Sequence, residues 1–188
     1  MDGQGEARNG VRRGWLLLGA VGLVLAASAG FLWPLDGIAP AAAAVDRPTP
    51  SGLPVPRWVS LKFGEVNARS GPGDDHRLLW IYRARGLPVQ VVAETSEWRR
   101  ICDPEQGLAW VHKRTTDGRR MVMRLAPPPL ALRRGPKSDS EIEAYLRPRA
   151  LASLIRCKKG WCRVRVDGTA GWAPAAALWG TNEASQCR

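Results

Sequence analysis

The sequence predicts an all-β protein: two tandem small β-barrels that follow an N-terminal signal or anchor helix. Three observations lead to this fold class. Four landmarks recur once, 62 to 64 residues further along the chain. The segments between landmarks are short, β-rich and bounded by turn residues, in a chain with 20 Gly and 15 Pro. No segment after residue 45 keeps the apolar period of 3.6 residues that an amphipathic helix needs. Short strands hide their edges best by closing into barrels.

The first 44 residues are typical of an export signal or a membrane anchor. An uncharged stretch, residues 15–33, follows Arg8, Arg12 and Arg13, and small residues ending in Ala44 come after it. This order is that of a secretory signal peptide. Because about 20 apolar residues can also span a bilayer, cleavage and anchoring both stay open. In either case we expect the rest of the chain to be periplasmic or otherwise extracytoplasmic, anchored to the inner membrane if residues 15–33 are retained.

Residues 45–57 contain four prolines and predict an extended linker. We expect a first barrel over residues 58–125, a second and divergent barrel over 126–180, and a C-terminal tail over 181–188. The first copy carries the landmarks Arg69–Pro72, Arg83–Leu87, Trp98–Ile101 and Ala109–Val111, and the second carries Arg133–Pro136, Arg147–Leu151, Trp161–Val164 and Gly171–Ala173.

Each expected strand has a local reason. Alternating apolar and polar residues at Glu65–Arg69 end in the turn signal Ser70–Gly73, and Trp98–Cys102 has the period of two of a half-buried strand. The other segments are runs of apolar, aromatic or β-branched residues. The remaining strands expected are Trp58–Lys62, Leu78–Tyr82, Val89–Ala93, Leu108–Val111, Leu130–Arg133, Ile142–Leu146, Leu151–Cys157, Trp161–Val166 and Ala170–Ala173.

The segment Val66–Gly73 resembles the V-N-x-R-x-G-P signature of bacterial SH3-like (SH3b) domains. Trp98–Ile101 and Gly107–Val111 match later landmarks of that family, and the similarity extends over residues 57–180. The second copy is more divergent, with Ala131-Leu132 in place of Val-Asn. The resemblance implies an exported small β-barrel of five to seven strands without catalysis of its own, serving as a binding module for peptidoglycan or envelope proteins.

Four residues are candidate ligand contacts. Arg69 either contacts a ligand or ties its own loop to a carboxylate or carbonyl group. Trp80 and Tyr82 have no aromatic counterpart in the second copy, so they are candidates for stacking on a sugar or peptide, with a place in the core as the alternative. Arg99 belongs to a basic strand that alternates with apolar residues.

The residue types needed for catalysis are scarce. The chain has only two histidines, His76 and His112, and shows no metal-ligand spacing, phosphate-binding loop or recognisable catalytic triad. We therefore expect no catalytic residue, no cofactor and no metal site, and a protein that is not an enzyme.

The four cysteines allow three pairings in an oxidising compartment. Cys157 and Cys162 flank a four-residue loop that suits a hairpin, which would place them opposite each other for a disulfide. A second bond, between Cys102 and Cys187, is left open, because a terminal segment is poorly ordered unless something ties it down.

The net charge of +11 belongs to the exported part, because acidic and basic residues cancel within residues 1–44. A basic surface favours anionic partners, although a solvated Arg-rich surface without any partner is the alternative. The sequence favours a non-catalytic exported module that contacts peptidoglycan or another anionic envelope component, such as cell-wall polymer. The alternative is a structural or regulatory subunit that docks an envelope protein through Pro-rich or peptide recognition. Export argues against a nucleic-acid partner, and the oligomeric state stays unknown.

Overall fold

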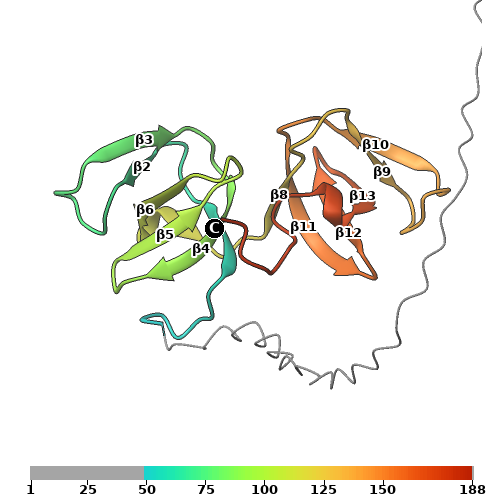
Figure 1. The fold of residues 1–188 in the computed structure, drawn as a ribbon. Helices are drawn as coiled ribbons and strands as arrows, with labels where there is room; N and C mark the ends of the chain where they lie inside the picture. The colour runs from blue at the N-terminus through green and yellow to red at the C-terminus, as the bar shows by residue number, and fades with distance from the viewer. Residues whose placement is uncertain (1–48, 188) are drawn as a thin grey trace, which may run out of the picture. The chain divides into compact units, whose positions relative to one another are not determined.

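The computed structural model describes residues 49–187, and these fold into strands and two short 3-10 helices (Figure 1). The all-β class predicted from the sequence is confirmed. Among the residues described, none forms a helix that is long and apolar enough to cross a membrane. The expected signal or anchor helix, with its apolar stretch 15–33, lies outside the described residues.

The first copy forms a seven-stranded antiparallel sheet in the order β3-β2-β6-β5-β4-β1-β7. A single turn of 3-10 helix, Lys113–Thr115, leads from β6 into β7. The strands are β1 (Arg57–Leu61), β2 (Val66–Arg69), β3 (Leu78–Tyr82), β4 (Pro88–Glu94), β5 (Trp98–Cys102), β6 (Leu108–His112) and β7 (Thr116–Asp117).

The second copy forms a six-stranded sheet in the order β10-β9-β13-β12-β11-β8, which repeats the first order strand for strand from β3 to β1. A second 3-10 turn, Ala175–Ala177, follows its last strand. The strands are β8 (Met121–Met123), β9 (Leu130–Arg133), β10 (Ile142–Leu146), β11 (Leu151–Lys158), β12 (Trp161–Val166) and β13 (Thr169–Pro174).

The register of the strands shows that the repeat read from the sequence is structural. Trp110 on β6 is paired with both Arg69 and Arg100. Trp172 on β13 is paired in the same way with Arg133 and Arg163. Equivalent landmarks therefore occupy equivalent places in the two sheets.

The expectation of closed barrels is wrong for the strands described. The first sheet ends at β3 on one side and at the two-residue β7 on the other, and no pairing joins these two edges. The second sheet likewise ends at β10 and β8. β7 has only two residues and both pair with β1, so it does not reach β3, and β8 at the end of the second sheet pairs with β11. The strands β3 and β10 are therefore left as sheet edges.

Each sheet has its own apolar core. Inward-facing residues of β1, β2, β4, β5 and β6 converge in the first copy, with Leu61, Val89, Val91 and Ile101 fully buried. The second core holds Leu132, Leu146, Val164 and their neighbours. Alternate residues of each strand point away from these cores, which is the period of two that the sequence shows.

The C-terminal segment, residues 179–187, is bound to the first sheet rather than hanging free as a tail. The indole Nε1 of Trp58 donates to the carbonyl of Asn182 at 2.7 Å, and the Gln90 amide donates to the carbonyl of Ala184 at 2.9 Å. The rings of Trp58 and Trp179 meet edge to face with centroids 5.0 Å apart. These contacts, with the link from Cys102 to Cys187, supply the tie that a terminal segment needs to be ordered.

Candidate functional site

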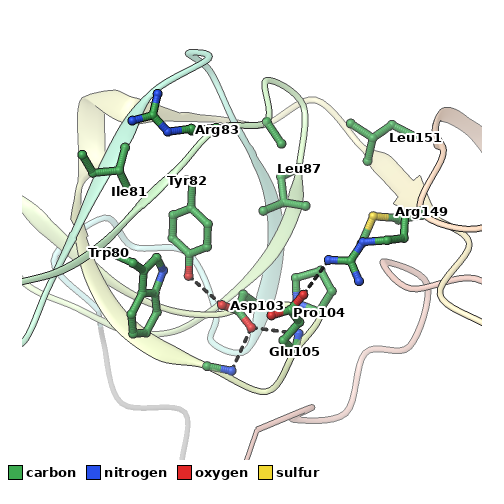
Figure 2. Close-up of a pocket in the computed structure, with 13 residues that line it drawn as sticks. Trp80, Ile81, Tyr82, Arg83, Leu87, Asp103, Pro104, Glu105, Arg149 and Leu151 are labelled. Carbon is green, nitrogen blue, oxygen red and sulfur yellow. Dashed lines mark hydrogen bonds and ion pairs between the residues drawn. The ribbon is translucent and has the colours of Figure 1, made fainter.

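A cavity of about 550 Å³ lies beside the exposed edge of the first sheet. One wall is β3 and the residues that follow it, and the opposite wall is the turn between β5 and β6 (Figure 2). Met123, Arg149 and Leu151 of the second copy complete the lining. The cavity is therefore built from three segments that are far apart in the sequence.

Tyr82 and Asp103 fix the geometry of this cavity. The Tyr82 hydroxyl donates to Asp103 Oδ2 at 2.9 Å (Figure 2). Asp103 Oδ1 accepts from the backbone N–H groups of Glu105 and Gly107, at 2.9 and 2.8 Å. Gly107 is required here, because a Cβ at this position would lie 2.6 Å from Asp103 Oδ2.

The Tyr82–Asp103 pair is suited to shaping a site rather than to catalysis. Burial, followed by the nearby negative charge of Asp103, raises the pKa of the Tyr82 phenol far above its usual value. The phenol therefore stays neutral and acts only as a hydrogen-bond donor. Asp103 already accepts three hydrogen bonds within the protein, so it is held in place as an acceptor.

Trp80 forms the aromatic part of the wall. Its ring meets that of Tyr82 edge to face, with centroids 5.9 Å apart and an interplanar angle of 90°. The Trp80 side chain remains 36% exposed, whereas Tyr82 is buried. Tyr82 thus supports an aromatic ring whose surface is open to the cavity.

Both signs of charge line the rim. Arg149 Nη2 is 2.5 Å from Glu105 Oε1, which links the second copy to the β5–β6 turn across the cavity. Arg83 lies on the other side and pairs with Glu65. Side chains at these pairs are more than 60% exposed, so they are weak pairs that a ligand can rearrange.

Arg69 lies at a second, smaller hollow of about 320 Å³. Its Nη1 donates to the carbonyl of His76 at 2.9 Å, and its Nη2 is 3.4 Å from Asp74. Arg133 donates to the carbonyl of Ser140 in the same way in the second copy. The tie between the arginine and its own loop is thus present in both copies.

Arg99 lies in neither hollow. It donates to the hydroxyl of Thr116 and lies 3.8 Å from Glu94, which also binds Arg57 and Ser51. Burial, and then the neighbouring charge of Arg57, lower the pKa of Arg99. The largest effect on Glu94, its burial, raises its pKa, but hydrogen bonds from Ser51 and Arg57 outweigh it and bring that pKa to about 2.

The two copies differ at the place where Glu94 meets Arg99. These residues are cross-strand partners on β4 and β5, and the partners at the same place on β11 and β12 are Cys157 and Cys162. Cys157 and Cys162 are joined, with their Cα atoms 4.0 Å apart, and Cys102 is joined to Cys187. An ion pair in one copy therefore takes the place of a disulfide in the other.

Several residues of the cavity carry no signal in the sequence. Asp103 and Glu105 occupy an ordinary polar turn, and Arg149 belongs to the other copy, so only the folded chain brings them to Trp80. Trp80 and Tyr82 could be found, because the equivalent positions in the second copy are Ala144 and Leu146. Among residues 49–187, no cluster of three or more His, Cys, Asp or Glu is arranged to hold a metal ion.

Comparison with known proteins agrees with this architecture. The family model of the bacterial SH3 domain matches residues 62–118 and again residues 126–180. No curated protein matches the chain. Among solved structures, NlpC1 of Trichomonas vaginalis is 14% identical, over 65% of this chain and 45% of that protein, with a TM-score of 0.30. NlpC2 of the same organism is 13% identical, over 66% and 48%, also with a TM-score of 0.30.

The chain spans about half the length of each of these two proteins. Its two matches to the family model cover more than half of its own residues, one match in each sheet. The strand order of the first sheet recurs in the second sheet, so the structure and the two family matches divide the chain into the same two copies. The chain belongs to the bacterial SH3 domain family and carries two copies of that domain.

Proposed function

We propose that this chain is an exported, non-catalytic module that binds peptidoglycan in the cavity beside Trp80. Membership of a family of binding domains supports a binding role. We assign the binding site to the first copy, whose sheet is β1 to β7, and treat the second copy, whose sheet is β8 to β13, as the part that completes the rim. We propose that the chain is located outside the cytoplasm, in the cell envelope. It is either free in the periplasm or anchored to the membrane through residues 15–33.

The observation that carries this proposal is an exposed aromatic ring in a cavity whose rim has both signs of charge. Sugar rings have apolar faces that stack on aromatic side chains such as Trp80. The peptide stems of peptidoglycan carry carboxylate groups, which can pair with Arg83 and Arg149. They also carry ammonium groups, which can pair with Glu105. A cavity of about 550 Å³ is within the size range of sites for small ligands.

The difference between the copies also favours this cavity. The structure places Ala144 and Leu146 of β10 where β3 has Trp80 and Tyr82. At these two positions the second copy therefore has no aromatic ring and no counterpart of the Tyr82 hydroxyl, which accounts for the absence of this hydrogen bond there. The second copy therefore serves as a comparison within the same chain, because it has the same fold without the groups to which binding is assigned.

Retention of the purified chain on isolated sacculi tests the proposal. Trp80→Ala is expected to reduce the retained fraction strongly, because it removes the stacking surface. Tyr145→Ala is the matched control, since Tyr145 is a 60% exposed aromatic residue on the equivalent edge strand of the second copy. Equal retention of both variants and the unmodified chain would refute this site.

A protein partner is the second candidate function, and the exposed edge strand favours it. β3 has unpaired backbone groups on one side, and Leu78 and Ile81 are 43% and 38% exposed. An extended peptide can add to such an edge as a further strand. If sacculi retain none of the chain while an envelope protein co-purifies with it, docking of that protein replaces wall binding.

A further inference from the structure

The outward side of the second sheet carries a concentration of positive charge that the cavity does not use. With their connecting turns, β11 to β13 contain five basic residues and one acidic residue, Asp167. The equivalent segment of the first copy, β4 to β6 with their turns, contains two basic and four acidic residues. The same segment of three strands and two turns is thus net positive in one copy and net negative in the other. This difference belongs to the individual copies and not to the fold they share.

The positive side chains lie together on one face. Arg156 and Arg163 are cross-strand partners, and Arg163 is also paired with Trp172 on β13. Lys158 and Arg165 lie two residues from these partners on the same strands, and residues two apart on a strand point to the same side. We call the set Arg156, Lys158, Trp161, Arg163, Arg165 and Trp172 the basic face.

The charges of the basic face are exposed and lack acidic partners. Its four basic side chains are all exposed, and none forms an ion pair with another residue in the range 49–187. In the first copy, by contrast, Arg57, Arg69 and Arg83 each pair with a carboxylate. Four like charges held close together repel one another, which an anionic ligand would relieve.

Aromatic rings are interleaved with these charges. Trp161 stands opposite Lys158 in the register and is only partly buried. The guanidinium carbon of Arg156 lies 5.4 Å from the centre of the Trp172 ring, which is itself buried at 7% exposure, so Trp161 supplies the accessible ring of the face. The face thus offers an apolar ring surface between cationic groups.

The strands hold these groups on a fixed and extended lattice. Side chains two apart along a strand are separated by about 6.6 Å, and neighbouring strands by about 4.8 Å. The link between Cys157 and Cys162 closes the end of the β11–β12 hairpin and fixes its register. Such an open array of side chains does not enclose a single small ion. Its spacing suits a polymer that carries an anionic group on several of its repeating units.

We propose that the basic face binds a linear anionic glycan, a chain of sugar units that bear carboxylate groups. The positive charges favour an anionic ligand, and their extended spacing favours a polymer over a single ion. The partly exposed Trp161 favours a polymer of sugar rings, because these have apolar faces that can stack on an indole. This site is separate from the cavity beside Trp80, which lies on the first copy. The two sites would let the chain hold two different envelope components at the same time.

Binding of polygalacturonate, a linear glycan with one carboxylate in each unit, tests this proposal, with uncharged dextran as the neutral probe. Arg163→Gln combined with Arg165→Gln is expected to weaken binding of polygalacturonate about tenfold, because exposed charge pairs each contribute only modestly. Arg77→Gln combined with Arg85→Gln is the matched control, since it removes two exposed positive charges from the first copy. This control is expected to change the affinity less than twofold.

Further variants separate the proposal from its rivals. Replacing Arg163 and Arg165 by lysine is expected to restore most of the affinity, and Trp80→Ala is expected to leave it unchanged while it lowers retention on sacculi. The proposal is overturned if the two double Gln variants lose affinity equally, since the binding would then follow net charge alone. Tighter binding of a single-stranded oligonucleotide of the same charge than of polygalacturonate also overturns it.

Discussion

Replacing Cys102 and Cys187 together by alanine is expected to destabilise the chain much more than the same change at Cys157 and Cys162. The bond between Cys102 and Cys187 joins residues 85 apart, whereas the other joins residues 5 apart. The chain-entropy model gives about 4.5 kcal/mol for the long loop and about 2 kcal/mol for the short one. Alanine keeps both buried positions apolar, so the change removes the link without burying a new polar group.

The structure adds a local consequence to this difference. Without the bond, residues 182–187 keep their hydrogen bonds to Trp58 and Gln90, while the stronger ties of the segment, at Trp179 and Gly180, lie before them in the chain. We therefore expect faster amide hydrogen exchange in residues 182–187 of this variant, and little change there in the variant at Cys157 and Cys162.

Urea-induced unfolding followed by tryptophan fluorescence measures both effects. The variant at Cys102 and Cys187 is expected to lose about 4–5 kcal/mol of unfolding free energy, and the variant at Cys157 and Cys162 about half of that. Equal losses would contradict the reasoning from loop length. No loss at Cys102 and Cys187 would mean that the C-terminal segment does not constrain the unfolded chain in solution.

Intact mass after alkylation without reduction should show no labelled cysteine, and labelling of both Cys157 and Cys162 would contradict the hairpin disulfide. Gly171→Ala should lower the unfolding free energy by about 1–3 kcal/mol, because the new Cβ would lie 2.7 Å from the Cβ of Leu132; an unchanged urea midpoint would show that Leu132 moves freely. Glu94 has a pKa of about 2 in the folded chain, below its ordinary 4.5, so it stabilises the fold above about pH 4.5 and this contribution is lost as the pH falls towards 2. Glu94→Gln should therefore flatten the fall in stability between pH 4.5 and 2, and parallel curves for the two proteins would count against the Glu94 hydrogen bonds.

The sequence predicts the strands and the tandem repeat because each depends on local pattern. Turn residues such as Gly71 and Pro72 and the alternation in Trp98–Cys102 mark strand ends and strand faces without any knowledge of the partner strands. The one expectation that fails is closure of the barrels, since closure depends on how far β7 reaches, which no local pattern records. The β7 strand of two residues leaves the sheet open.

The candidate site is only partly visible in the sequence, for a related reason. Comparison of the copies isolates Trp80 and Tyr82, because their counterparts are small or aliphatic. Their partner Asp103 lies 21 residues from Tyr82, and Arg149 comes from the other copy, so their role depends on tertiary contacts. Pairing within the folded sheets also reveals that Arg99 is held beside Glu94 and Thr116.

The most direct test of the binding account is nuclear magnetic resonance of the nitrogen-15-labelled chain during titration with soluble peptidoglycan fragments. Each tryptophan indole N–H gives its own signal, so the rings of the two copies report separately. If peptidoglycan binds in the cavity, the Trp80 signal shifts in a saturable manner, together with backbone signals of Glu105 and Gly107, while that of Trp161 stays in place. Saturable shifts confined to Trp161 and its neighbours, or no shift at Trp80 with fragments that the chain demonstrably binds, would contradict it.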